Sequence, residues 1–329
     1  MLFGKAIHNT MVGVGMALAV GVAILSGLGP VANLSLMTLS AMVPIALPAI
    51  GELLNEHGGL FNIGIEGMML VASLVAVYGA EVFRSGTAGL LVGSGVGALL
   101  ALLFGTAITY GRANQTIAGL GLNFFGIGAV AFFMFDIWGV RGFRHVDAAL
   151  RIQPLVTPFG PVRWISLATF IAPALAAFLL YRTRFGLHLR ACGHNALVSD
   201  VSGINVHRVR LTACVLAGAL AGLGGAYMSI DWLGMASVDL IAGRGFVALA
   251  CVVFSGLNPW RALVAALVFA VFNATGLWLQ VEPWAKPLMI RGGSSFFLMM
   301  PYAAVLALLA AAPSLERFPK EIGRPFRRG

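Results

Sequence analysis

Long apolar stretches, separated by short polar segments, follow one another along nearly the whole chain. A helix needs about 20 mostly apolar residues to cross the hydrocarbon core of a bilayer. Stretches of this kind predict about ten transmembrane helices, and they lie at 9–28, 33–50, 63–80, 88–110, 116–135, 164–181, 208–230, 244–257, 261–280 and 294–312. The fold class is therefore an all-α polytopic membrane protein, with some helices broken or short. The eighth stretch is short, and we expect it to be tilted or to be a half-helix enclosed by its neighbours.

The composition agrees with this pattern. Hydrophobic residues make up 59% of the chain, charged residues only 10%, and the mean hydropathy is +0.93. Soluble domains usually carry about 25% charged residues. A membrane β-barrel is excluded because its strands alternate over about 10 residues. Since the composition does not change abruptly anywhere, residues 1–329 form a single transmembrane domain.

The basic residues indicate the orientation of the chain. The net charge is +9, and Lys and Arg gather in the segment 182–210 and in the tail 313–329. Cytoplasmic loops of membrane proteins carry an excess of basic residues. With both segments in the cytoplasm, alternation of the spans places 13 of the 21 basic residues inside and both termini in the cytoplasm. Because the membrane topology accounts for the charge, no nucleic acid is expected as a partner.

Small residues recur at helical spacing. Gly89, Gly93 and Gly97 are four apart in one predicted span, and Gly218 and Gly222 are four apart in another. Such stripes allow helix backbones to approach closely. They predict a compact bundle rather than a wide pore.

One carboxylate lies inside a very apolar stretch, "GGLFNIGIEGMML". Its glycines predict a break in the helix near 58–64, which is tolerated at membrane depth only where protein or a cavity surrounds it. In one interpretation Asn62 caps the new helix and Glu66 occupies its first turn, where the helix dipole favours a negative charge. In the other, Asn62 and Glu66 border a transport path, since ionisable groups inside membranes are often functional.

Two further amides lie next to aromatic residues within predicted spans. Asn123 is close to Phe125 in "LNFFG", and Asn273 lies in "VFNATGLW". An amide beside aromatic rings can bind a flat heterocycle or a sugar ring. It can equally make a hydrogen bond between helices, which is common in membranes. Both interpretations remain open from the sequence.

The segment 182–210 is too polar to cross a membrane. Its apolar residues recur at helical spacing, which predicts a short amphipathic helix along the cytoplasmic face. The alternatives are a docking element for a cytoplasmic partner and an ordinary basic connector.

Several kinds of chemistry find no support. None of the three lysines follows a glycine-rich phosphate loop, and no cysteine or histidine pair has metal-binding spacing. An integral membrane enzyme would have to use Glu52, Glu56 and His57 in "GELLNEHGG", which we expect to be solvated loop residues. A non-catalytic chain without a metal or cofactor of its own is expected.

At these residues the chain resembles a known family. The segments "NIGIEGMML", "ANQTIAGLGLNFFGIG" and "FGLHLRACGHNALVSDVSGINVHRVRL" are similar to permease subunits of bacterial ABC importers of the branched-chain amino acid, ribose and nucleoside class. The stretch "GELLNEHGGLFNIGIEGMML" looks most like the simple-sugar and nucleoside permeases. The resemblance covers about residues 40–312. Relatives often have proline where this chain has Ala196.

The resemblance implies a set of partners in a bacterial inner membrane. These are a related second permease chain, an ABC ATP-binding subunit that binds ATP and Mg, an extracytoplasmic substrate-binding lipoprotein and membrane lipid. It also implies that the segment 186–205 is a coupling helix seated on the ATPase. The candidate coupling residues are Gly186, Arg190, Gly193, Asn195 and Gly203.

The sequence thus predicts a permease subunit that imports a small neutral polar solute. The resemblance favours nucleosides, with simple sugars such as ribose as the alternative. The candidate residues of the substrate path are Asn62, Glu66, Asn123, Phe125 and Asn273. A secondary transporter or channel working without an ATPase is a rival of a different class, but it would need charged relays, and Glu66 is nearly alone.

Overall fold

The structure, a computed structural model, describes residues 29–157 and 160–281, together with residues 299, 303, 319 and 321–323. Seven helices in this part of the chain are long and apolar enough to cross a membrane. The predicted spans 9–28 and 294–312 lie outside the continuously described residues, so the count of about ten stays a prediction.

Helices dominate the described residues, with four short strands on the loops. The elements in chain order are α2 (Gly29–His57), α3 (Ile65–Phe83), α4 (Gly86–Thr109), α5 (Gln115–Trp138), β1 (Phe143–His145), η1 (Ala148–Leu150), β2 (Leu155–Thr157), β3 (Gly160–Val162), α6 (Trp164–Thr169), α7 (Ala172–Arg182), α8 (Arg184–His194), α9 (Ala196–Val201), α10 (Val206–Tyr227), η2 (Met228–Trp232), β4 (Met235–Ser237), α11 (Arg244–Ser255) and α12 (Pro259–Val281).

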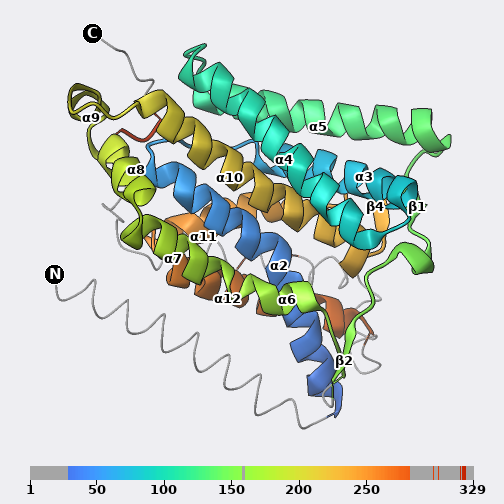
Figure 1. Cartoon of the computed structure of the whole chain (residues 1–329). Coiled ribbons are helices and arrows are strands. Elements are labelled where there is room, and N and C mark those ends of the chain that lie inside the picture. Colours follow the sequence, from blue (N-terminus) through green and yellow to red (C-terminus); the bar gives the residue numbers. More distant parts are fainter. Residues whose placement is uncertain are drawn as a thin grey trace.

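Helices α2 and α10 form the centre of the bundle. On one side α10 packs against α3 and α4, and α5 covers α3; on the other side α2 packs against α11 and α12. Figure 1 shows α5 along one edge of the molecule and α7 and α12 along the opposite edge. The core therefore runs between layers of helices, as expected when apolar helices bury their faces against one another.

Local sequence signals explain where several helices begin and end. Asn114 precedes α5, and its Oδ1 accepts hydrogen bonds from the N–H groups of Thr116 and Ile117 at 3.0 and 3.1 Å. Gly139 ends α5 in the left-handed conformation, with φ 65°. A side-chain cap and a left-handed glycine satisfy backbone groups that the helix itself leaves unpaired.

The predicted glycine stripes form the contact between α4 and α10. A Cβ built on Gly97 would lie 2.3 Å from the Gly218 carbonyl oxygen and 2.6 Å from Gly222 Cα. Only glycine fits at this distance, so the two backbones touch directly. The prediction of close helix packing is confirmed here.

The segment between α5 and α6 folds into two small antiparallel pairs. Strand β1 pairs with β4, and β2 pairs with β3 as a hairpin. Arg163, just before α6, forms an ion pair with the buried Asp231 in η2, a π-helix. This ion pair fixes the end of the loop to the end of α10.

The predicted span 33–50 is part of a longer helix. Helix α2 continues to His57, so Glu52 and Glu56 lie within it. Their side chains are fully buried, and His57 is only 8% exposed. The prediction that these three residues are solvated and lie in a loop is wrong, because α2 continues seven residues beyond the predicted span and its end is covered by protein; the buried backbone that follows also needs Glu52 as a partner, as described below.

Two variants of α4, one at the glycine contact with α10 and one on the exposed face, test this packing. Gly97→Ala should destabilise the protein by about 1–3 kcal/mol, because overpacking displaces one backbone from the other. Gly95 lies on the exposed face of the same helix, where an added Cβ meets nothing within 4 Å. Gly95→Ala should therefore leave the thermal midpoint of the detergent-purified protein unchanged or raise it. Equal midpoints for the two variants would contradict the packing argument.

Candidate functional site

The helix breaks where the sequence predicts. Helix α2 ends at His57 and α3 begins at Ile65. Asn55 starts the turn, since its carbonyl accepts hydrogen bonds from the N–H groups of Gly58 and Leu60 at 2.9 and 3.0 Å. Gly59 has φ +80°, a conformation that glycine adopts without strain. The break at 58–64 is thus a defined turn rather than a loose loop.

Side chains from α2 and α5 accept hydrogen bonds from backbone N–H groups of the break. Glu52 Oε1 accepts a hydrogen bond from the Asn62 N–H at 2.7 Å, and its Oε2 accepts one from Asn55 Nδ2 at 2.8 Å. Gln115, at the start of α5, accepts one from the Phe61 N–H at 2.7 Å. Buried backbone groups need such partners. This role of Glu52 and Gln115 was not predicted from the sequence, although polar residues beside a predicted break are a usable signal.

Asn62 shapes the break but does not cap α3. The N-cap position belongs to Gly64, which makes no side-chain hydrogen bond. Asn62 Oδ1 instead accepts a hydrogen bond from the Gly64 N–H at 2.8 Å. The predicted N-cap is therefore displaced: the amide closes a local turn before the helix, as Asn side chains often do.

Glu66 occupies the first turn of α3, as predicted, but its carboxylate binds a different helix. Its two oxygens accept hydrogen bonds from the N–H groups of Gly243 and Gly245, both at 2.7 Å. These groups open α11, and the first N–H groups of a helix have no partner within it. A carboxylate there also interacts favourably with the helix dipole. Glu66 therefore caps the short helix α11 from across the fold.

Asn123 joins α5 to the break. Its Oδ1 accepts a hydrogen bond from the Gly67 N–H at 2.8 Å, and its Nδ2 donates one to the Ile63 carbonyl at 3.0 Å. The side chain is 8% exposed. Of the two interpretations that the sequence left open, the structure shows the hydrogen bond between helices.

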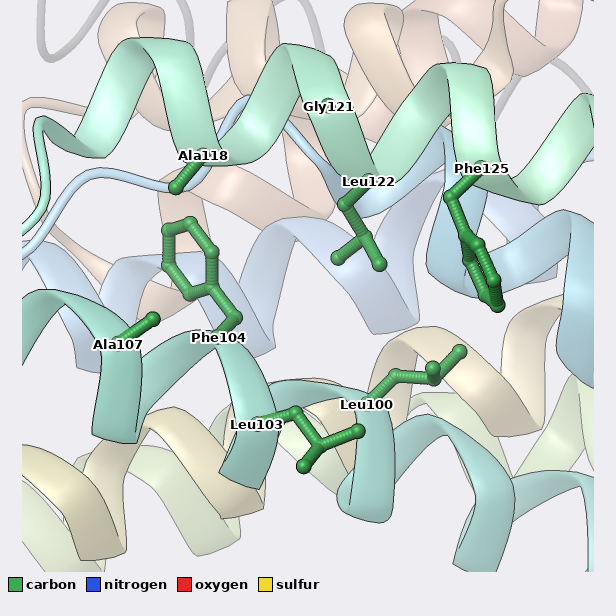
Figure 2. Close-up of a pocket in the computed structure, with 8 residues that line it drawn as sticks. All are labelled: Leu100, Leu103, Phe104, Ala107, Ala118, Gly121, Leu122 and Phe125. Atoms are coloured by element: carbon green, nitrogen blue, oxygen red, sulfur yellow. The ribbon is translucent and has the colours of Figure 1, made fainter.

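Phe125, also in α5, is 55% exposed. It lines an apolar pocket of about 320 Å³ between α4 and α5. Figure 2 shows its ring beside Leu122 and above Leu100, with Phe104 further along the pocket. All eight lining residues are apolar or glycine. This pocket offers surface to a hydrophobic neighbour and no polar group to a solute.

Asn273 lies apart from the other candidate path residues. It belongs to α12, which packs against α2, α7 and α11, whereas α5 packs against α3 and α4. Helices α5 and α12 are on opposite sides of the bundle in Figure 1. The structure therefore brings together Asn62, Glu66 and Asn123 around the break, and separates Phe125 and Asn273 from them.

The segment 182–210 contains two short helices, α8 and α9, in agreement with the predicted helical character. Thr183 caps α8 through a hydrogen bond from the Gly186 N–H at 3.1 Å. Asn195 caps α9 through one from the Val198 N–H at 3.0 Å. Ala196 is then the first residue of α9, a position at which proline is also accommodated. The replacement of proline by alanine does not alter the cap.

Two of the candidate coupling residues face the protein itself. A Cβ on Gly186 would lie 2.2 Å from the Leu179 carbonyl oxygen, and one on Gly193 would lie 2.1 Å from the His57 carbonyl oxygen. These glycines seat α8 against α7 and the end of α2. The first contact bends the chain between α7 and α8, and the second places α8 directly beside the break.

The outward face of α8 and α9 exposes four apolar side chains next to polar ones such as Arg184 and His194. Arg190 lies at its edge, where its Nε donates to the Gly186 carbonyl at 3.3 Å and its guanidinium lies 5.3 Å from the Tyr181 ring centroid. Gly203, with φ +85°, follows α9. We name four residues with side chains 57–90% exposed the α8–α9 face: Leu187, Leu197, Val198 and Val201. Such a patch on a monomer is typical of an interaction site.

A buried arginine completes the site. Arg210, in the first turns of α10, is 2% exposed, and its Nε donates a hydrogen bond to the Gly58 carbonyl at 2.8 Å. The sequence analysis counted it only as one of the basic residues of the cytoplasmic loop. A fully buried arginine requires such partners.

The sequence of the chain matches a known protein family and several named relatives. A family model described as "Branched-chain amino acid transport system / permease component" matches residues 34–309. The chain belongs to this permease family. The match covers the break, both short helices and the apolar helices, so the resemblance of the quoted motifs is confirmed.

The named relatives include nucleoside permeases and a sugar permease. A nucleoside ABC transporter permease protein of Lactococcus lactis is 32% identical over 287 residues, covering 81% of this chain and 88% of the relative. A guanosine ABC transporter permease protein of Bacillus subtilis is 29% identical, covering 89% and 95%. A ribose import permease protein of Escherichia coli is 26% identical, covering 89% and 90%. No solved structure matches the chain.

Together with the seven apolar helices, the family confirms the expected multi-pass protein of a bacterial inner membrane. The nucleoside and guanosine relatives are named as permease proteins of ABC transporters, and the ribose relative as an import permease.

The contact between Glu66 and α11 leads to a stability prediction. Glu66→Ala leaves two partly buried N–H groups without a partner, at a cost of up to about 1–3 kcal/mol each. Glu66→Gln keeps one oxygen acceptor and should fall between the alanine variant and the wild type. The measurement is the thermal midpoint of the purified permease in detergent. An alanine variant as stable as the wild type would show that this hydrogen-bonded cap does not stabilise the fold.

Proposed function

We propose that this chain is the permease subunit of an ATP-driven importer that moves a small neutral polar solute, above all nucleosides, into the cell. The observation that carries this proposal is the 32% identity with a nucleoside permease over 81% of the chain. Simple sugars are the second candidate, because the ribose permease is also similar over most of both chains.

The polar groups around the break support a neutral solute. The carboxylate of Glu66 is bonded to Gly243 and Gly245, and that of Glu52 is bonded to Asn55 and Asn62. Carboxylates whose oxygens are already hydrogen-bonded inside the protein are poor partners for a charged solute, since re-pairing them would leave buried backbone groups unsatisfied.

The proposed topology has about ten spans with both termini in the cytoplasm. The stretches 9–28 and 294–312 would supply two spans, and α11 would be the short one. Twelve residues of α11 extend only about 18 Å, less than the hydrocarbon core of about 30 Å. The basic segments 182–210 and 313–329 support a cytoplasmic location for α8, α9 and the tail.

In the proposed mechanism each chain of the complex has a separate role. An ABC ATP-binding subunit, which supplies the ATP and Mg sites, would bind the α8–α9 face, so that its closure moves α8. A second, related permease chain would line the path together with this one, and an extracytoplasmic lipoprotein would deliver the solute. This chain itself does no covalent chemistry. Of the candidate path residues, Phe125 is the one with a largely exposed side chain.

Uptake measurements test the function and its substrate. Uptake of labelled nucleosides, ribose and leucine is compared in host cells with and without this gene, with the genes for its ATPase and binding protein intact. Loss of nucleoside uptake alone is the expected result. Loss of ribose or leucine uptake instead would keep the importer and change the substrate, and uptake that persists without the ATPase would favour a secondary transporter.

A charge placed on the α8–α9 face tests the docking of the ATPase. Val201→Glu puts a carboxylate on a side chain that is 90% exposed. Co-purification of the ATPase should fall by about tenfold or more, because an unpaired charge would be buried on binding. The matched control is Val156→Glu, in which an equally exposed valine lies on the hairpin at the far end of the molecule (Figure 1). Equal losses in the two variants would exclude this docking surface.

A further inference from the structure

A short stretch of the carboxy-terminal tail lies against both the break and α8. The Glu321 N–H donates a hydrogen bond to the Gly193 carbonyl, and the Gly323 N–H donates one to the Gly59 carbonyl, both at 3.2 Å. Gly193 is near the end of α8, and Gly59 is in the break. Figure 1 shows this dark red segment beside α8 and α10. About 260 residues of chain separate Gly59 from Gly323, so no local propensity brings them together.

At Gly59 the break, α10 and the tail are in close contact. A Cβ built there would lie 2.9 Å from Arg210 Nη2 and 3.1 Å from Glu321 Cβ. A Cβ built on Gly193 would lie 2.1 Å from the His57 carbonyl oxygen and 3.2 Å from the Gly59 nitrogen. Close-packed groups without voids move together, because they cannot deform continuously.

Charge adds to these backbone contacts. Glu321 lies close enough to Arg210 to stabilise its positive charge. Arg210 in turn binds the Gly58 carbonyl. One guanidinium therefore links α10, the break and the tail. In a site with little water, such a charge interaction is stronger than on an exposed surface.

We propose that residues 321–323 act as a clasp that fastens α8 to the helix break, so that movement of α8 is passed on to the residues around Glu66 and Asn123. Glu321 and Gly323 are its positioning residues. This inference rests on the proposed function, because it assigns the clasp a place between an ATPase and the transport path. Without the clasp, α8 can move while the break stays in place, and ATP hydrolysis is no longer coupled to transport.

Cys192 provides a direct reporter of the clasp. It is fully buried in α8 next to Gly193. Burial raises the pKa of its thiol, which slows alkylation further, because the thiolate is the reactive form. Cys192 packs with Ala196 of α9 and Val206 of α10, so its thiol is exposed only when release of the clasp lets α8 lift away from α10 as well as from the break.

The first experiment measures N-ethylmaleimide labelling of Cys192 in membranes, in a Cys214→Ala, Cys251→Ala background. Glu321→Arg places a second positive charge beside Arg210 and should speed labelling about fivefold or more by local opening. Glu321→Gln removes only the attraction and should give a smaller increase. Gly323→Ala strains the positive φ of 73° without adding a charge and should also increase labelling. Unchanged labelling in all three variants would overturn the clasp.

The second experiment measures solute transported per ATP hydrolysed, in proteoliposomes that contain both permeases and the ATPase, with binding protein added. Glu321→Arg should lower this ratio about tenfold, a coupling of typical size, while ATP hydrolysis continues. Asp239→Arg, a charge reversal at an exposed site beyond β4, is the control and should keep the ratio. Faster labelling with an unchanged ratio would overturn the transmission role.

The two experiments separate this inference from the proposed function. Wild-type proteoliposomes that hydrolyse ATP without moving any solute would overturn the proposed function. The labelling experiment needs no transport, so it tests the clasp independently.

Discussion

The structure depends on one constraint: the turn that joins α2 to α3 is buried in protein, and the polar backbone groups of that turn need partners. Water is scarce there, and an unpaired N–H or C=O costs several kcal/mol. The break between α2 and α3 meets this requirement through the side chains of Glu52, Asn62, Gln115, Asn123 and Arg210. These residues come from three helices (α2, α5 and α10) and the turn itself, so those helices are fixed in register with one another.

The same constraint connects the break to the parts that would perform transport. Gly193 allows α8 to touch the end of α2, and Glu66 extends the network to α11. A displacement of α8 would therefore act on a set of hydrogen bonds rather than on an apolar interface whose side chains can rearrange. Because hydrogen-bond networks of this kind have few alternative arrangements, they favour two discrete states over gradual deformation.

Apolar length and glycine spacing predicted much of this fold from the sequence. The break at 58–64, the contact through Gly97 and the helical segment after Thr183 all follow from local patterns. The partner of Glu66 does not, because 177 residues separate it from Gly243. The burial of Glu52 does not follow from local patterns either. A run of polar residues after an apolar stretch resembles a loop, unless one considers that the backbone N–H groups of the next segment need partners. Long-range pairings of this kind have no periodic signature.

The capping of α11 by Glu66 also bears on how the chain is made. Glu66 leaves the ribosome 177 residues before Gly243. At about 5–20 residues per second, this corresponds to roughly 10–35 s of synthesis. During that interval the carboxylate is in the nascent bundle without its final partner, and α11 is too short to insert as an independent span. The carboxylate that caps α11 is therefore made before α11 itself, an order of synthesis that favours docking of α11 onto protein over partitioning into lipid.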